Sequence, residues 1–113
     1  MPDTIFKKII NKEIPANIAY EDDLCIAFHD VQPKAPVHVL LIPKQEIENV
    51  AALTENDRDV AGHLLVKVHE VAELLDLENG YRIVANCGAD GGQSVDHLHF
   101  HILGGRALGW PPG

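Results

Sequence analysis

Cysteine is scarce in this chain of 113 residues, which contains only Cys25 and Cys87 and no C-x-x-C spacing. Two cysteines so far apart cannot supply the disulfide framework of a small secreted domain or a four-thiolate zinc site. Free cysteine often behaves as a small apolar core residue, and it stays reduced inside cells. We therefore interpret both residues as reduced core residues of an intracellular protein.

Long apolar runs and an excess of basic residues are also missing. No run approaches the roughly 20 residues of a transmembrane helix, and the start, MPDTIFKKII, has no signal-peptide or transit-peptide character. We expect a soluble, cytoplasmic protein. Acidic residues outnumber basic ones by 17 to 9, a formal charge of −8. This balance argues against nucleic acid and anionic membranes as partners, but it leaves a small phosphate ligand possible.

The periodicity of apolar residues predicts one α+β domain over residues 1–113, since no linker or internal repeat divides the chain. Alternating or continuous apolar runs predict strands over residues 24–29, 38–42, 81–87 and 98–103. Strands that follow one another, with only one long helix, favour an antiparallel sheet over parallel βαβ units.

Two helices are expected, and both have recognisable caps. Asp3 or Thr4 caps a short helix whose apolar stripe includes the isoleucines at positions 5, 9 and 10. Thr54 and Asp57 form a variant of the capping box at the start of a long helix. Gly80 is expected to adopt the left-handed conformation that ends this helix.

Three of the seven histidines alternate with apolar residues at His97, His99 and His101. Because side chains in a strand alternate between faces, the three imidazoles point the same way. Leu98, Phe100 and Ile102 then face a core, which explains the apolar set and leaves the histidines to a function. A pair of them could bind zinc, with His38 or Asp96 as a third ligand. Alternatively, the imidazoles act directly as nucleophile and acid or base.

A glycine-rich segment, residues 88–94, lies directly upstream of the three histidines. Its three glycines let the backbone approach a ligand closely, and successive N–H groups in such a turn can bind an anion. It lacks the G-K-[ST] of a P-loop and leads toward a strand. Beside three histidines, this segment favours an oxyanion-binding role.

Residues 97–103, HLHFHIL, resemble the His-φ-His-φ-His-φ-φ signature of the histidine triad (HIT) family at every position. Segments that are similar to its Hint branch, the histidine triad nucleotide-binding proteins, extend over essentially the whole chain: residues 3–6, 14–16, 27–30, 35–36, 42–44, 90–94 and 110–113. The resemblance implies a HIT-like fold, an antiparallel five-stranded sheet with one long and one short helix. It also implies a homodimer that continues the sheet from subunit to subunit.

The resemblance further implies hydrolysis of purine nucleoside 5′-phosphoramidates through a nucleotidyl-histidine intermediate. By this analogy His99 attacks the α-phosphorus, while His101 and Ser94 contact the phosphate and help to protonate the leaving amine. His97 and His38 would support the nucleophile from behind. Splitting one difficult displacement at an anionic phosphorus into two easier ones is the advantage of covalent catalysis.

The analogy also implies a set of nucleotide-binding residues. Asp30 would hold the ribose hydroxyls, apolar side chains would line the base pocket, and the glycine-rich segment would contact the phosphate. The full set is Ile5, Phe6, Ile9, Phe28, Asp30, Val31, Asn86, Gly92, Gln93, Ser94, His99, His101 and Trp110. Residues 104–113 would form a tail that reaches the partner subunit, and no metal or other cofactor is expected.

Three alternatives stay open at this point. One is a dinucleoside polyphosphate hydrolase, as in the Fhit branch of the same superfamily. Another is a nucleotide-binding regulatory protein with incidental hydrolysis, and the third is a zinc-dependent hydrolase. The Trp-Pro-Pro-Gly ending favours the Hint branch, and turnover, substrate profile and metal content would separate the four.

Overall fold

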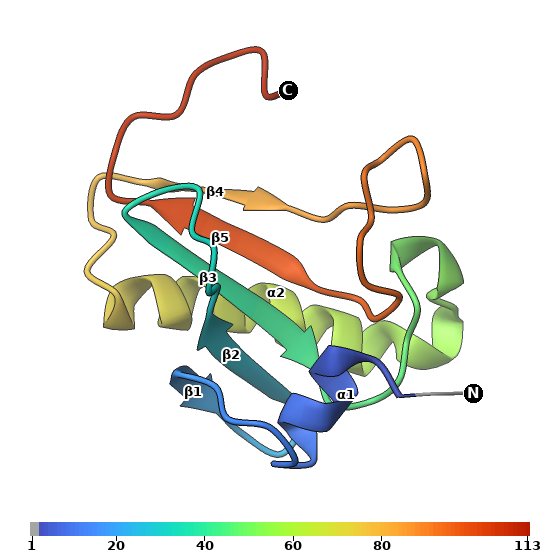
Figure 1. The fold of residues 1–113 in the computed structure, drawn as a ribbon. Coiled ribbons are helices and arrows are strands. Elements are labelled where there is room, and N and C mark those ends of the chain that lie inside the picture. Colours follow the sequence, from blue (N-terminus) through green and yellow to red (C-terminus); the bar gives the residue numbers. More distant parts are fainter. Residues whose placement is uncertain (1–2) are drawn as a thin grey trace.

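A five-stranded antiparallel sheet in the order β1-β2-β3-β5-β4 forms the centre of the fold (Figure 1). A computed structural model of the chain describes residues 3–113. The sheet confirms the predicted α+β class. Its strands are β1 Ile18–Glu21, β2 Cys25–His29, β3 Val37–Pro43, β4 Tyr81–Val84 and β5 Phe100–Gly104.

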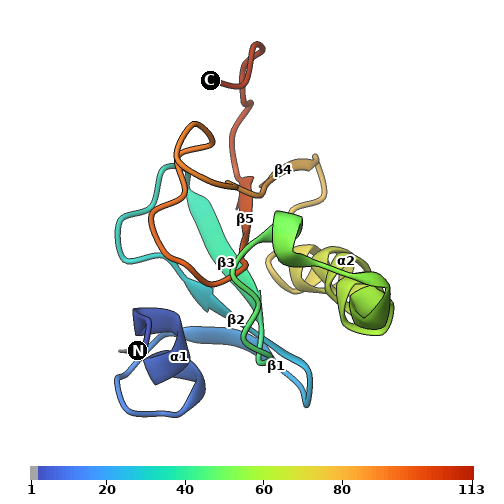
Figure 2. The same cartoon turned by 90° about the vertical axis from the view of Figure 1, so that its right-hand side faces the viewer.

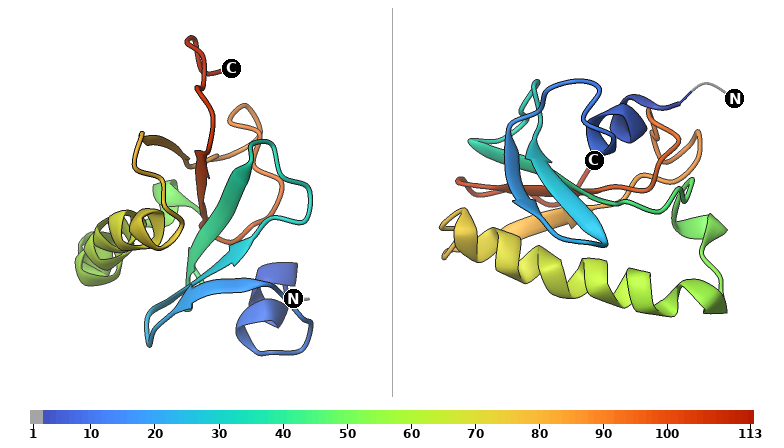
Figure 3. Two further views of the ribbon diagram at one scale, coloured as in Figure 1. Left: turned by 90° about the vertical axis from the view of Figure 1, so that its left-hand side faces the viewer. Right: turned by 90° about the horizontal axis from the view of Figure 1, so that it is seen from below.

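Two helices cover opposite faces of this sheet (Figure 2), and the further views show the same three layers (Figure 3). The short helix α1 spans Ile5–Ile10, and the long helix α2 spans Arg58–Leu74. Two short 3₁₀ helices, η1 Val50–Ala52 and η2 Glu55–Asp57, lie between β3 and α2. None of the helices within residues 3–113 is both long and apolar enough to cross a membrane.

The N-terminal caps of the helices use the predicted residues, but the C-terminal end of α2 differs from the prediction. The Thr4 side chain accepts a hydrogen bond from the Lys7 N–H, as predicted for α1. The capping box of Thr54 and Asp57 is present, but it caps η2, which runs directly into α2. The prediction for Gly80 is wrong, because Asp76, with a φ of 58°, takes the left-handed conformation just after α2. Gly80 has a φ of 108° directly before β4.

Each face of the sheet packs against its own helix. On the α2 face, Ala27, Val39, Leu41 and Ile102 of the sheet are buried in one cluster with the apolar stripe of α2. The α1 face buries a smaller cluster, made of Phe6, Ile9, Ile26, Phe28, Leu40 and Ile42. Because neighbouring residues of β2 and β3 alternate between these clusters, both faces of the central strands are apolar.

One strand was not expected, and several strand boundaries differ from the predicted ones, those of β2 and β3 by a single residue. The β1 strand has no counterpart among the strands predicted from periodicity, and β4 ends at Val84 instead of Cys87. The strand predicted over 98–103 begins only at Phe100, since the N–H of Leu98 donates to the carbonyl of Ile47 instead of to a neighbouring strand. Only His101 of the three alternating histidines therefore lies within β5.

Residues 105–113 follow β5 and run away from the sheet to the C-terminus (Figure 1). The guanidinium of Arg82 on β4 donates hydrogen bonds to the carbonyls of Leu108 and Gly109, which ties this tail to the sheet edge. Beyond this tie, the Trp110 side chain is 83% exposed. The tail is anchored along part of its length, and its largest apolar group faces solvent in the single chain.

Candidate active site

Four histidines gather on the α1 face of the sheet. His38, His97 and His99 are buried, with 5%, 2% and 4% of their surface exposed, and His101 is partly buried. The rings of Phe6 on α1 and His99 pack in a T-shaped arrangement, with centroids 5.0 Å apart. Leu98 and Phe100 pack toward α2 instead. The predicted division of this segment into a histidine face and an apolar face is thus confirmed, although β5 starts later than expected.

His99 is held in one tautomer by the backbone of its own segment. Its Nδ1 lies 2.7 Å from the carbonyl oxygen of His97. A carbonyl oxygen only accepts, so Nδ1 carries the proton and donates it. In a neutral imidazole the other nitrogen, Nε2, then keeps its lone pair. An unprotonated imidazole nitrogen is a competent nucleophile.

A chain of three hydrogen-bonding groups fixes the opposite tautomer in His101. The backbone N–H of Lys34 donates to Nδ1 of His38 at 3.0 Å, so the proton of neutral His38 is on Nε2. This Nε2 lies 2.8 Å from Nδ1 of His101, which must accept. His101 therefore carries its own proton on Nε2. Two neighbouring imidazoles, with ring centroids 5.0 Å apart, thus offer one lone pair and one N–H.

Burial keeps the imidazoles of His38, His97 and His101 neutral near pH 7. Loss of solvation lowers the pKa of His97 and of His38 below the ordinary value for histidine. The same cause, reinforced by the neighbouring His99 and His38, lowers the pKa of His101 to about 4. His97 is fixed by donating from Nε2 to the carbonyl oxygen of Pro43 at 2.8 Å. The neutral state of His38 and His101 is the one in which the hydrogen bond between them fixes the tautomer of His101.

A cavity of about 520 Å³ opens between α1, β2 and the histidines. Phe6 and Phe28 provide an apolar wall, and His99 and His101 provide a polar one. Cavities with a mostly apolar lining and a few converging polar groups are typical of sites for small molecules. Of the residues expected to bind nucleotide, the cavity is lined by Ile5, Phe6, Ile9, Phe28, Asp30, Val31, Ser94, His99 and His101.

A second cavity, of about 340 Å³, adjoins the first and shares Asp30, Gln32, Ser94 and His101 with it. His38 and Asn86 contribute to its other walls. The Asp30 carboxylate accepts from the N–H of Gln32 at 2.8 Å through Oδ1, and its Oδ2 lies 3.5 Å from Nε2 of His38. The shared residues therefore lie where a ligand could extend from one cavity into the other.

The glycine-rich segment is shaped by one amide side chain. Gln93 donates to the carbonyls of Glu48 and Val95 and accepts from Asn49 and from the N–H of Gly88. All four hydrogen-bonding positions of this amide are therefore filled within the protein. Gln93 lines neither cavity, so its side chain organises the loop instead of facing a ligand.

Gly91 is required by close packing in the same loop. A Cβ on Gly91 would lie 2.4 Å from the carbonyl oxygen of Cys87, a distance that Cβ atoms do not reach. The Asn86 side chain donates to the carbonyl of Gly91 at 2.6 Å. The loop therefore turns back tightly on its own start, close to Ser94 and the histidines.

A family model described as the HIT domain matches residues 11–108 of this chain. The chain is also 60% identical over 111 residues to an uncharacterized HIT-like protein of Synechocystis sp., covering 98% of this chain and 97% of the relative. The protein belongs to the HIT family. This membership was predicted from the motif at residues 97–103.

Solved structures of other HIT proteins have the same fold. A HIT family hydrolase from Legionella pneumophila is 41% identical, with a TM-score of 0.95, and the match covers 98% of this chain and 100% of that one. A histidine triad nucleotide-binding protein from Candida albicans is 33% identical, with a TM-score of 0.82, over 96% of this chain and 83% of that one. The five-stranded HIT-like fold expected from the sequence is thus confirmed.

Some expected site residues of this HIT protein lie outside the two cavities, and two of the histidines make other contacts than expected. Gly92, Gln93 and Trp110 line neither cavity. His38 was expected behind His99, but its ring contacts His101. His97 supports His99 through its backbone carbonyl, while its ring is turned toward Pro43.

Sequence reasoning also missed several supporting groups of this HIT protein. The Lys34 N–H and the Pro43 carbonyl are backbone atoms, which leave no residue signature. Gln32 could have been found, because an Asp whose carboxylate accepts from the N–H two residues later is a common turn. Asn49 gave no local signal, since its partner Gln93 lies 44 residues away.

The structure does not bring together the ligands that the zinc interpretation of the histidine motif requires. Within residues 3–113, the ligand atoms that converge at this site belong to Asp30, His38 and His101, and they lie within 4.8 Å of one another. This group contains one histidine of the motif instead of the pair that the interpretation needs. Moreover, Nδ1 of His101 already accepts from His38. The hydrogen bonds of the four histidines favour direct imidazole chemistry.

Proposed function

We propose that this HIT protein belongs to the Hint branch and hydrolyses purine nucleoside 5′-phosphoramidates through a nucleotidyl-His99 intermediate. The observation that carries the proposal is the hydrogen bond from Nδ1 of His99 to the His97 carbonyl. This bond leaves an unprotonated Nε2 on a side chain that lines a cavity of nucleotide-compatible size. The likeness to the Legionella hydrolase and to the Candida nucleotide-binding protein supports the choice of reaction and ligand.

In the first half-reaction, Nε2 of His99 attacks the α-phosphorus, an N–P bond forms, and the bond to the leaving nitrogen breaks. The leaving nitrogen takes one proton and departs as an amine. His101, which presents an N–H at Nε2, and Ser94 line both cavities and can pass this proton from solvent. Fixed N–H donors also stabilise the charge that develops on the phosphate oxygens.

In the second half-reaction, water attacks the phosphorus of the intermediate and the N–P bond to His99 breaks. The products are a nucleoside monophosphate and free His99, whose Nε2 recovers its lone pair, and the proton of the water returns to solvent. Each cycle thus consumes one water molecule and leaves the imidazole unchanged. Because Nδ1 keeps its bond to the His97 carbonyl, the ring holds one orientation throughout.

The nucleotide would lie in the larger cavity, with the base against Phe6 and Phe28 and the ribose hydroxyls on Asp30. A carboxylate can accept from both hydroxyls of a cis-diol, which suits Asp30 to this role. An apolar wall favours a purine over solvent, but it discriminates weakly between adenine and guanine. The leaving group would then extend past Ser94 and His101 toward the smaller cavity.

We also propose that the protein acts as a homodimer in which two sheets meet edge to edge. β4 is an edge strand of the sheet, and its Ile83 is exposed. Unpaired edge strands readily pair with another chain. Arg82 on this strand also anchors the tail that carries Trp110, so the same edge would bring the tail to the partner subunit.

The experiment that tests the function compares substrates at known active-site concentration. Adenosine and guanosine 5′-phosphoramidates are assayed beside dinucleoside polyphosphates, and product is counted per subunit. We expect many turnovers on both phosphoramidates and a much lower kcat/KM on the polyphosphates. A preference for polyphosphates would assign the protein to the alternative hydrolase. Binding of nucleotide without multiple turnovers would identify it as a regulatory binding protein.

A further inference from the structure

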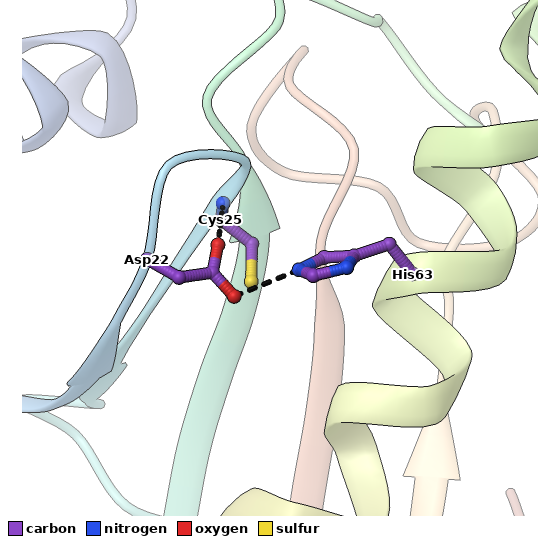
Figure 4. Close-up of side chains that lie close together, drawn as sticks. All are labelled: Asp22, Cys25 and His63. Atoms are coloured by element: carbon purple, nitrogen blue, oxygen red, sulfur yellow. Dashed lines mark hydrogen bonds and ion pairs between the residues drawn. The ribbon is translucent and has the colours of Figure 1, made fainter.

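A second group of chemically reactive side chains lies on the opposite face of the sheet from the histidine cluster. Asp22 comes from the turn between β1 and β2, Cys25 is the first residue of β2, and His63 projects from α2 (Figure 4). Cys25 belongs to the core that packs against α2, while His99 packs against Phe6 on α1. The proposed hydrolysis uses none of these three residues.

The backbone around Asp22 directs one of its oxygens at His63. Oδ1 accepts from the N–H groups of Leu24 and Cys25, at 2.8 and 2.9 Å. Oδ2 is thereby aimed toward α2, where it lies 2.7 Å from Nε2 of His63 (Figure 4). The hydroxyl of Tyr20 also donates to Oδ2, at 2.8 Å. The turn thus fixes the carboxylate before any ligand arrives.

The ligand atoms of Asp22, Cys25 and His63 all lie within 4.8 Å of one another. Thiolate, imidazole and carboxylate are the three ligand types that zinc takes in proteins. The thiolate and the imidazole favour zinc over magnesium or calcium, which prefer oxygen ligands. The side chains of Asp22 and His63 are 22% and 25% exposed, so the group has an open side toward solvent. An ion can enter from that side, and a water molecule there can serve as the fourth ligand of the ion.

A nucleophilic cysteine is the other chemistry that Cys, His and Asp can provide, and the geometry excludes it here. Cys25 has no exposed surface, so a substrate cannot reach its sulfur. The nitrogen of His63 that would activate a thiol is directed at Asp22 instead. Burial also raises the pKa of the Cys25 thiol to about 12, which is opposite to the change that activates a nucleophile.

We propose that Asp22, Cys25 and His63 bind one zinc ion that joins the β1–β2 turn to helix α2. The ion would sit between Oδ2 of Asp22, Sγ of Cys25 and Nε2 of His63, with water completing a tetrahedron. Oδ2 and Nε2 would move apart slightly to admit it, because they are now at hydrogen-bond distance. This differs from the absence of metal expected from the sequence, and it does not depend on the proposed hydrolysis.

Binding changes the protonation of two ligands. The Cys25 thiol releases one proton to solvent as the sulfur–zinc bond forms. Nε2 of His63, which now donates to the Asp22 carboxylate, gives up its proton to solvent, and the ring holds a proton on Nδ1 so that Nε2 can coordinate. The carboxylate and the thiolate together balance the charge of the ion. Tyr20 keeps its hydrogen bond to the Asp22 carboxylate and orients it, as partners of metal ligands commonly do.

The test uses Co²⁺ as a spectroscopic probe on the full chain after removal of metal with a chelator. A cobalt–thiolate bond gives a charge-transfer absorption that carboxylate and imidazole ligands do not give. We expect one equivalent of Co²⁺ to produce this band and one equivalent of Zn²⁺ to remove it. Cys25→Ser should abolish the band, while Cys87→Ser, at the other cysteine of the chain, should keep it.

Because Cys25 is buried, its variant can fail to fold, and His63→Gln provides an independent arm. Zn²⁺ should raise the midpoint of thermal unfolding of the parent protein and of Cys87→Ser, but not of His63→Gln. Absence of the cobalt band in the parent protein would overturn the proposal. So would a zinc-dependent rise that persists in His63→Gln, because the ion would then bind elsewhere, for example at Asp30, His38 and His101.

Discussion

Nε2 of His38 lies 2.8 Å from Nδ1 of His101, although the two residues are 63 positions apart. The donor in this pair is known, because Nδ1 of His38 is already occupied by the Lys34 N–H. His38 therefore determines which nitrogen of His101 carries the proton in the neutral state. In the proposed mechanism, His38 acts on the reaction through His101 and is a positioning residue.

Two variants of His38 test this relationship. His38→Gln can place an amide N–H near the position of Nε2 and keep the bond to His101, while His38→Ala removes it. We expect kcat to fall by about 100-fold in His38→Ala, because a wrong tautomer of a catalytic imidazole is costly. His38→Gln should retain several-fold more activity. Equal kcat values in the two variants would show that packing, and not the hydrogen bond, is what His38 supplies.

The nucleophile is tested by His99→Ala. Removing a covalent catalyst should lower kcat by on the order of 10³ or more, while nucleotide binding and folding persist. Rapidly quenched parent protein should carry one nucleotidyl group on His99 by mass spectrometry, provided that acid is avoided. A variant that keeps a tenth of the parent kcat would exclude His99 from this role.

The buried neutral state of His101 makes stability depend on pH. Its pKa is about 4 in the folded chain and 6.5 as an ordinary histidine, so the unfolded chain binds more protons between these values. The contribution is fully retained above pH 6.5 and is lost as the pH falls toward 4, by up to about 3 kcal/mol. His38 and His97 act in the same direction.

Denaturant unfolding at pH 7.5 and at pH 5 measures this effect. The free energy of unfolding should be lower at pH 5 in the parent protein, and the difference should be smaller in His101→Gln. Hydrogen bonds to the Asp57 carboxylate lower its pKa, so the contribution of Asp57 to the free energy of unfolding is lost only at more acidic pH and does not interfere. An identical difference in both proteins would contradict the depressed pKa of His101.

Two glycines with opposite surroundings form a matched pair. Gly91→Ala places a Cβ against the Cys87 carbonyl, whereas Gly62→Ala, inside α2, meets nothing within 4 Å. Gly62→Ala should stabilise the protein by roughly 0.5–1 kcal/mol, because alanine is the better helix former. Gly91→Ala should lower kcat/KM by at least tenfold, since the loop beside Ser94 must rearrange. Parent-like kinetics in Gly91→Ala would show that this loop does not shape the site.

The parts of the fold that were predictable from the sequence depend on local pattern. The Thr4 cap and the stripe of α2 follow from residues within one or two turns of each other. β1 was missed because its four residues are exposed or half-buried and its pairing with β2 is irregular, so its sequence shows no clean alternation. Asp76 took the conformation expected of Gly80 because α2 ends six residues earlier.

The candidate site was predictable in its residue types and only partly in its contacts. The alternation of histidines and apolar residues indicated two faces, and both faces exist. The partner of His38 and the full engagement of Gln93 depend on contacts between segments more than 40 residues apart. Such contacts are set by tertiary packing, and a single sequence carries no periodic signal for them.

The last prediction concerns the tail, which is anchored at one point and exposes one large apolar side chain. Arg82 holds the carbonyls of Leu108 and Gly109, yet Trp110 is 83% exposed in the single chain. Burying a large aromatic side chain contributes roughly 1.5–3 kcal/mol. In the proposed homodimer, we expect Trp110 to pack on the partner subunit and to contact the leaving group.

Trp110→Ala is the sharper variant for this prediction, and truncation after Gly105 is the broader one. Truncation also removes Arg106, whose guanidinium donates to the carbonyl of Lys34, the residue whose N–H holds His38. If Trp110 contacts the leaving group, Trp110→Ala should change the relative kcat/KM values of phosphoramidates that differ only in the amine by several-fold. The same variant should weaken the dimer in analytical ultracentrifugation. An equal loss on every substrate would indicate destabilisation of the chain instead. Unchanged kinetics and an unchanged dimer would mean that Trp110 stays in solvent, and the prediction would then be wrong.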